Sequence, residues 1–333
     1  MTLGVGRFHA TMRGAFSLCG RGRVAFPRNS CDSSANSFSE FEQMNDNARG
    51  ALYMNIAMLA FTLNDTSMKA VTLTMPLWQA ISLRGVLTTA ALVAIGVMMG
   101  GLRLVPQGRD RAILIIRTIA ELGATALFLV ALTHMPLANL SAIMQSLPLA
   151  VTLVAAAVLG EKVGWRRMLA IAIGFVGVMI IIRPGTAGFD RWALMGLGSV
   201  ACVVVRDLST RQLSRQVPSA TVAIWASGSV LAMGLIGLGI DGWQPVTATE
   251  SMWIVAASAN LIVGHMFVIM VMRVGDISFV APFRYMALFW AILMGWLLFD
   301  TLPDQWTVIG ALIVVAMGIF TFWRERQLVR MAR

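Results

Sequence analysis

Long apolar stretches, separated by short polar breaks, follow one another along the chain from about residue 50 onward. Each stretch has about 20 residues, the length of helix that crosses a hydrocarbon core of roughly 30 Å. Charged residues, prolines and glycines separate the stretches and set the ends of the expected helices. The pattern predicts ten transmembrane helices, near residues 50–70, 77–99, 112–132, 138–159, 166–183, 190–211, 219–239, 252–272, 278–299 and 305–323.

The composition agrees with a chain that is solvated by lipid. Hydrophobic residues make up 58% of the chain and charged residues 13%, with a mean hydropathy of +0.76. Soluble domains carry about a quarter charged residues, and a soluble chain of this length could not bury so much apolar surface in one core. Cys19, Cys31 and Cys202 have no CxxC spacing, so neither a disulfide framework nor a metal site is predicted, and no cofactor is expected.

Residues 1–48 differ from the rest, because they contain no long apolar run. A secretory signal peptide needs about 7–15 apolar residues in sequence, so we predict a disordered cytoplasmic tail instead. Met44 stands just before the first apolar stretch and is an alternative start. If translation began there, residues 1–43 would be no part of the native protein.

The net charge of +10 comes mainly from arginines in short loops and at the chain ends. In a soluble protein this charge would suggest nucleic-acid binding, but here we interpret it as a topology signal, since cytoplasmic loops carry the excess of Lys and Arg. One set of alternate loops has only Lys69, Arg183 and Arg191. The sequence therefore predicts a multi-pass protein of the bacterial inner membrane, with both termini cytoplasmic and no nucleic-acid partner. The basic set contains Arg103, Arg109, Arg111, Lys162, Arg166, Arg167, Arg211, Arg215, Arg273, Arg324, Arg326, Arg330 and Arg333.

An internal duplication divides the ten predicted helices into two sets of five. Residues 62–76 align with 204–218, and residues 159–178 align with 298–318. Five is an odd number, so the two halves enter the membrane in opposite senses, and inverted repeats place a substrate near midplane. The first alignment superposes Asp65 on Asp207, Lys69 on Arg211 and Pro76 on Pro218.

The passage from the fourth to the fifth predicted helix, MPLANLSAIMQSLPLAVTLVAAAVLGEKVGWRRMLAIAIGFVGVMII, has a Gly160–Glu161 turn followed by a glycine-containing helix. This passage resembles the drug/metabolite transporter superfamily, EamA type, and the resemblance covers about residues 48–324. The second copy departs from the pattern, because Phe299–Asp300 stands in place of Gly–Glu.

The resemblance implies an all-α membrane protein with ten transmembrane helices in two inverted five-helix repeats. The expected organisation is a tail at 1–48, repeats at 49–185 and 186–324, and a basic cytoplasmic tail at 325–333. The implied activity is secondary transport of a small polar metabolite, such as an amino acid, S-adenosylmethionine, riboflavin or a nucleoside. A drug or metabolite efflux pump of the same fold is the alternative, and the protein is expected to be a monomer or a homodimer.

Several polar side chains inside the predicted spans are candidates for binding substrate. Arg84 lies about 12 Å into the second span at 1.5 Å per residue, and Asp65 on the first span is its expected partner. Arg284 follows Pro282 in the ninth span and aligns with Gln145 in the fourth, so this pair across the repeat axis is the first candidate. The aromatic rings expected to contact a planar ligand are those of Tyr285 and Trp225.

A second set of charges is predicted to act in coupling or gating. Asp65 and Lys69 are four residues apart, so they share a helical face, and they either neutralise each other or act in gating. Asp207 and Arg211 repeat this spacing in the second half. The remaining pair is Arg117 with Glu121, in which the carboxyl group is the candidate proton carrier because burial raises a carboxyl pKa.

Other functions fit the sequence less well. The chain has no GxxxxGK[ST] phosphate loop, which disfavours a primary pump, and its three histidines are scattered, which disfavours an intramembrane enzyme. A channel and a purely structural membrane protein stay open as alternatives. The predicted mechanism is alternating access, in which the two five-helix halves rock about the bound substrate.

Overall fold

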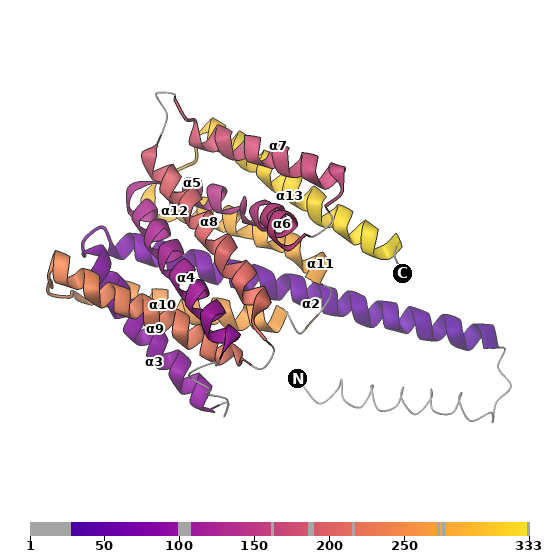
Figure 1. The fold of residues 1–333 in the computed structure, drawn as a ribbon, viewed down its shortest axis with the longest axis horizontal. Helices are drawn as coiled ribbons and strands as arrows, with labels where there is room; N and C mark the ends of the chain where they lie inside the picture. Colours follow the sequence, from indigo (N-terminus) through magenta and orange to yellow (C-terminus); the bar gives the residue numbers. More distant parts are fainter. Residues whose placement is uncertain are drawn as a thin grey trace.

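The structure is a computed structural model and describes residues 28–98, 108–160, 163–185, 190–214, 217–271, 274 and 277–331. All regular elements in these ranges are helices (Figure 1). They are α2 (Arg28–Val71), α3 (Leu77–Met98), α4 (Arg109–His134), α5 (Leu137–Met144), α6 (Leu147–Leu159), α7 (Trp165–Ile182), α8 (Arg191–Gln212), α9 (Ser219–Asp241), α10 (Ala248–Val271), α11 (Ile277–Val280), the 3₁₀ helix η1 (Ala281–Tyr285), α12 (Met286–Phe299) and α13 (Gln305–Met331).

The helices match the ten predicted spans, and the all-α membrane class is confirmed. By length and composition, nine helical segments of the described chain can cross a membrane. The remaining span is the second half of α2, which is more polar because it carries Asn55, Asn64 and Asp65. Asn55 has a partner in the membrane, since its side-chain oxygen accepts a hydrogen bond of 2.8 Å from the Trp290 indole.

The two chain ends are more helical than the sequence predicts. Helix α2 begins at Arg28 and has 44 residues, so the disorder expected for residues 28–48 is not found, while residues 1–27 lie outside the described range. No proline or glycine stands between residues 28 and 49. Extending an existing helix requires no new nucleation step, so each added turn costs little free energy. Helix α13 likewise continues to Met331, into the predicted basic tail.

The most extensive helix contacts join the two sequence halves. Helix α2 packs on α10, and α8 packs on α4, and these two pairs are images of each other under the inverted repeat. Helix α3 packs on α9, and α7 lies along α13, so each of these pairs joins a helix to its own equivalent (Figure 1). The contacts therefore follow the twofold relation that the duplication predicts.

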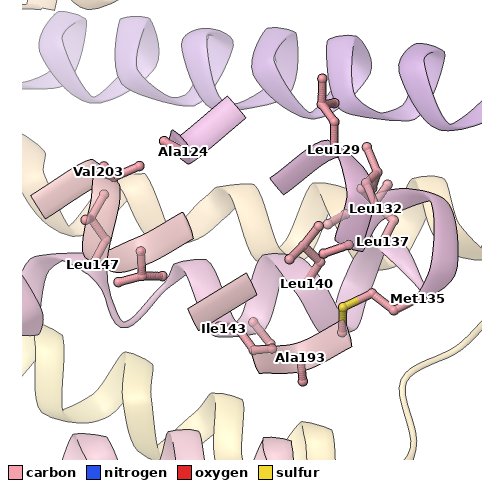
Figure 2. Packing of buried hydrophobic residues seen from close by; sticks show 14 of the residues in the cluster. Ala124, Leu129, Leu132, Met135, Leu137, Leu140, Ile143, Leu147, Ala193 and Val203 are labelled. Carbon is pink, nitrogen blue, oxygen red and sulfur yellow. The ribbon is translucent and has the colours of Figure 1, made fainter. Parts of the chain in front are cut away.

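Two bundles form around α2 and α8. Helix α2 contacts both α10 and α12, and we call these three helices the α2 bundle. Helix α8 contacts both α4 and α6, and we call these three helices the α8 bundle. The α2 bundle has its own apolar cluster, formed by residues such as Met54, Met58 and Val271. Figure 2 shows a larger cluster in which Leu132 of α4, Ile143 of α5 and Val203 of α8 take part.

This packing does not fit the prediction that the five-helix halves move as rigid bodies. Each bundle takes helices from both halves, so separating the halves would open the interfaces α2–α10 and α4–α8 together. Close-packed interiors resist such separation, because every lost contact forfeits dispersion energy. The units that can move intact are the two mixed bundles.

The fourth and ninth spans are both interrupted. Helix α5 ends before Gln145 and Ser146, and α6 continues with Pro148 in its first turn. In the ninth span the short 3₁₀ helix η1, which contains Pro282, separates α11 from α12. A proline removes a backbone donor and disfavours the regular helix before it, which explains both interruptions.

The two interrupted spans also end in the same backbone conformation, at two residues that are offset by one position in the sequence alignment. Gly160 ends α6 with φ 69°, and Asp300 ends α12 with φ 51°, so both residues are left-handed helix caps. The alignment had instead placed Gly160 on Phe299. Glycine adopts this conformation freely, and aspartate is one of the few other residues that tolerate it.

Helices α7 and α13 cross at glycines. A Cβ atom on Gly177 would lie 2.8 Å from the Gly310 carbonyl oxygen, and one on Gly310 would lie 2.5 Å from the Gly177 carbonyl oxygen. Small residues allow membrane helices to approach in this way.

Replacing Gly177 with alanine is expected to lower the free energy of unfolding by about 1–3 kcal/mol, the usual cost of overpacking. The matched control is Gly239→Ala in α9, where a Cβ atom would meet nothing within 4 Å. Thermal unfolding of both variants in detergent checks this expectation. Equal stability of the two would contradict the close crossing of α7 and α13.

Candidate functional site

Seven charged side chains lie at least one helical turn inside the predicted spans of the described chain. Four are arginines and three are carboxylates, and they come from α2, α3, α4, α8 and η1. Charges at this depth are costly and mark functional sites by default. They are Asp65, Arg84, Arg117, Glu121, Arg206, Asp207 and Arg284.

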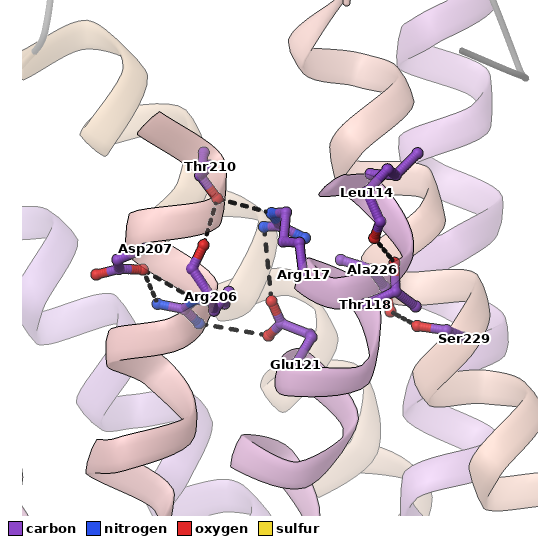
Figure 3. Close-up of polar contacts among 9 residues, drawn as sticks. All are labelled: Leu114, Arg117, Thr118, Glu121, Arg206, Asp207, Thr210, Ala226 and Ser229. Atoms are coloured by element: carbon purple, nitrogen blue, oxygen red, sulfur yellow. Dashed lines mark hydrogen bonds and ion pairs between the residues drawn. The ribbon is translucent and has the colours of Figure 1, made fainter. Parts of the chain in front are cut away.

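The largest group of these charges lies between α4 and α8 (Figure 3). Glu121 is 3.6 Å from the Arg117 guanidinium and 3.4 Å from the Arg206 guanidinium. Arg206 also pairs with Asp207 at 2.9 Å, and Arg117 donates a hydrogen bond of 2.9 Å to Thr210. The group thus holds two arginines and two carboxylates, so its charges balance.

Glu121 is the centre of this group and is not sealed from solvent. Its side chain is 17% exposed, and that of Arg206 is 27% exposed. A carboxylate between two guanidiniums can move from one partner to the other without losing its counter-charge. The pairing of Glu121 with Arg117 was expected, whereas the contribution of Arg206 was not.

A related arrangement lies on α2 and α3. The Asn64 amide donates a hydrogen bond of 2.9 Å to Asp65, and Arg84 donates one of 3.3 Å to the Asn64 oxygen. Arg84, which is buried, therefore reaches Asp65 through the amide that stands between them. Under the repeat alignment, Asn64 and Asp65 correspond to Arg206 and Asp207, so an acid with a polar neighbour occurs in both halves.

Arg84 joins α3 to α2 through its hydrogen bond with Asn64, and α2 in turn contacts α4. The position predicted for Arg84, deep in the second span and close to Asp65, agrees with this geometry. We call these two groups of charges, on α2 and α3 and between α4 and α8, the polar region.

Lys69 has different partners from the one that its spacing suggested. Its ammonium group donates hydrogen bonds to the carbonyl oxygens of Leu132 (2.8 Å) and Met135 (2.7 Å), at the end of α4. It also lies 5.7 Å from the centre of the Phe299 ring. A cation at a helix C-terminus satisfies free carbonyl groups and opposes the helix dipole. Lys69 therefore ties α2 to α4, while Asp65 turns to Asn64.

Arg211, the counterpart of Lys69, lies exposed in the last turn of α8. The inverted repeat puts Lys69 and Arg211 at opposite ends of the bundle. Their suggested role as paired gates stays a prediction.

The residues of the interrupted spans lie at the breaks themselves. Gln145 is buried at the end of α5, and Tyr285 is buried at the end of η1. Arg284 lies in η1, two residues after Pro282, and the residue is exposed. The Tyr285 hydroxyl is buried and, within the described chain, has no hydrogen-bond partner.

The two aromatic residues that are predicted to contact a ligand lie on different helices. Tyr285 stands next to Arg284, as the sequence requires, and its hydroxyl packs against Gly318 of α13. Trp225 is half-buried on α9, a helix that packs on α3 and α4. The five predicted substrate residues thus come from α3, the end of α5, η1 and α9, and their part in binding substrate stays a prediction.

A separate hollow of about 320 Å³ lies at the end of the bundle where α5, α7, α8 and α13 meet. Its wall includes Asn139, Asp190 and the ion pair between Arg183 and Asp304. None of the seven interior charges contributes to it. It is thus distinct from the polar region.

Comparison with known families identifies the first half of the chain. Residues 48–183 match the EamA-like transporter family. The match covers α2 from residue 48 through the end of α7, which corresponds to the first five predicted spans, and the resemblance to EamA-type drug/metabolite transporters is confirmed.

Three curated proteins that are similar to this chain are named as transporters. The S-adenosylmethionine uptake transporter of Rickettsia prowazekii is 22% identical, covering 59% of this chain and 66% of its own length. The riboflavin transporter of Vibrio cholerae is 28% identical, with 56% and 63% covered. The matches to these two thus span a little under two thirds of their lengths. The pseudopaline exporter of Pseudomonas aeruginosa is 22% identical, with 81% and 94% covered.

A solved crystal structure has the same fold over most of this chain. It superposes with a TM-score of 0.59 at 20% sequence identity, covering 84% of this chain and 99% of the other. The likeness therefore extends beyond residues 48–183 into the second half. At this identity it establishes the fold alone.

Proposed function

We propose that this protein is a secondary transporter, which moves a small polar metabolite across the bacterial inner membrane by alternating access. The observation that carries the proposal is the set of seven interior charges, which lie within an inverted arrangement of helices. Inverted repeats with broken helices are the usual architecture of secondary carriers. The named activities of the relatives support the same class of function.

The two mixed bundles are the bodies that rock in this mechanism. Helix α5 of the fourth span contacts α12 of the ninth span, so the two interrupted spans meet each other. Substrate binds near Arg284, Gln145 and Arg84, and the bundles close over it from alternate sides. In the conformation observed, Lys69 joins the two bundles at the end that carries the predicted extracytoplasmic loops.

Both chain ends face the cytoplasm in this proposal. The basic loops follow α3, α6, α8 and α10, which places them at one end of the bundle together with the end of α13. An excess of Lys and Arg in short loops marks the cytoplasmic side. The direction of transport is not part of the proposal, since the relatives include both uptake transporters and an exporter.

Counterflow in proteoliposomes tests the proposal. Purified protein is reconstituted, and uptake of labelled amino acids, S-adenosylmethionine, riboflavin and nucleosides is measured with and without a pH gradient. Saturable exchange of one compound is expected, and protein-free liposomes give the background. Uptake that rises linearly with concentration and admits labelled sucrose would indicate a channel, while no exchange of any compound by folded protein would contradict the metabolite proposal.

A further inference from the structure

Arg284 differs from the other three interior arginines in its bonding. Arg84 donates to Asn64, Arg117 pairs with Glu121, and Arg206 pairs with Glu121 and Asp207. Among the residues that the structure describes, no hydrogen bond or ion pair reaches the Arg284 guanidinium. Because four arginines face three carboxylates, the interior of the described chain also carries one positive charge in excess.

The position of Arg284 makes this charge available to a ligand. It stands on η1, where the ninth span is interrupted, and the residue is exposed. Helix η1 contacts α2, and α12 of the same span contacts α5. Charged side chains within membrane spans face the interior of the bundle or a water-filled cavity, so we expect Arg284 to face such a space and not the surrounding lipid.

We infer that Arg284 binds an acidic group, a carboxylate or a phosphate, on the transported molecule. A guanidinium in a membrane is costly without a counter-charge, and its planar fork matches carboxylate and phosphate oxygens. Asp207 is already paired with Arg206, so an incoming acid supplies the missing negative charge. The assignment of this acid to the transported molecule rests on the proposed function, whereas anion binding at Arg284 does not.

The same chemistry could come from the phosphate of a lipid headgroup, and arginine labelling distinguishes the two sources. The full chain in an uncharged detergent is treated with phenylglyoxal, and peptide mass spectrometry follows each arginine. We expect Arg284 to react faster than Arg84, Arg117 or Arg206, whose guanidiniums are held in bonds. Sodium acetate or sodium phosphate should slow the reaction at Arg284 relative to sodium chloride of equal ionic strength.

Three results of this labelling would overturn the inference. Arg284 could react no faster than the bonded arginines, which would mean that its guanidinium is not accessible. Acetate and phosphate could both fail to protect it. Phosphatidylglycerol could protect it while acetate and phosphate do not, which would identify a lipid headgroup as the ligand.

Substitution provides a second, independent measurement. Arg284→Gln should leave the midpoint of thermal unfolding unchanged or raise it, because no bond is lost. In the unchanged protein, acetate or phosphate should raise this midpoint by binding at Arg284. In Arg284→Gln the apparent affinity for this effect should be at least about tenfold weaker. Arg284→Lys keeps the charge without the fork, so it should lie between. The control is Arg111→Gln, which removes the same charge at the exposed start of α4 and should not change the anion effect.

These measurements separate failure of the inference from failure of the transport proposal. Anion protection at Arg284 without counterflow of any compound would leave the anion site and contradict transport. Counterflow of a compound that has no acidic group, with no anion effect at Arg284, would support transport and overturn the inference.

Discussion

Glu121→Gln is expected to abolish accumulation driven by a pH gradient and to leave substrate exchange intact. Glu121 pairs with Arg117 on its own helix and with Arg206 on α8. If transport takes one proton per substrate, a gradient of one pH unit supports about tenfold accumulation, because about 1.4 kcal/mol corresponds to a factor of ten. Glutamine keeps the shape and cannot titrate, so accumulation should fall to the external concentration.

Counterflow and gradient-driven uptake in the same proteoliposomes check this prediction. The control is Asp300→Asn, an acid-to-amide change at an exposed helix end where asparagine also tolerates the left-handed conformation. Undiminished accumulation by Glu121→Gln would exclude Glu121 as the proton carrier. Loss of folding in that variant would show instead that the carboxylate is needed for the charge balance between α4 and α8.

Arg206→Met is expected to destabilise the protein by about 3–5 kcal/mol, the cost of removing one member of a largely buried ion network. Arg206 is the only residue in the described group that contacts both Glu121 and Asp207. Its removal leaves Asp207 without this partner and leaves two carboxylates where one guanidinium, Arg117, remains. The loss should appear as a lower midpoint of thermal unfolding in detergent.

A double substitution tests the cause. If the lost stability comes from uncompensated charge, Asp207→Asn added to Arg206→Met should recover a substantial part of it. Arg211→Met, one turn further along α8, is the matched control and should cost much less, because that side chain is exposed at the helix end. Equal losses at Arg206 and Arg211, or no recovery in the double variant, would argue against an ion network at α4 and α8.

The candidate site could be predicted from the sequence only in part. Arg117 with Glu121, and Arg84 close to Asp65, follow from helical spacing and from the cost of a lone charge in lipid. Arg206 was missed, although it aligns with Asn64 and stands beside Asp207. A polar residue next to an acid in both repeats was the signal that could have found it.

Partners across helices were harder to predict than partners along one helix. The spacing made Asp65, four residues away, one possible partner of Lys69, but Lys69 caps α4 instead. A long, flexible ammonium side chain near a helix end can reach the free carbonyl groups of a neighbour, and spacing along one helix contains no information about that neighbour.

The sequence by itself determined the membrane class, the ten spans and the inverted duplication. In lipid every backbone polar group must be satisfied within its own helix, so an apolar stretch of sufficient length specifies a helix before any tertiary contact forms. Only the tertiary structure decided which helices pair, and hence that the bundles around α2 and α8 mix the two halves. Side chains that face lipid and side chains that face another helix are equally apolar, so their pattern does not reveal which face of a span meets which neighbour.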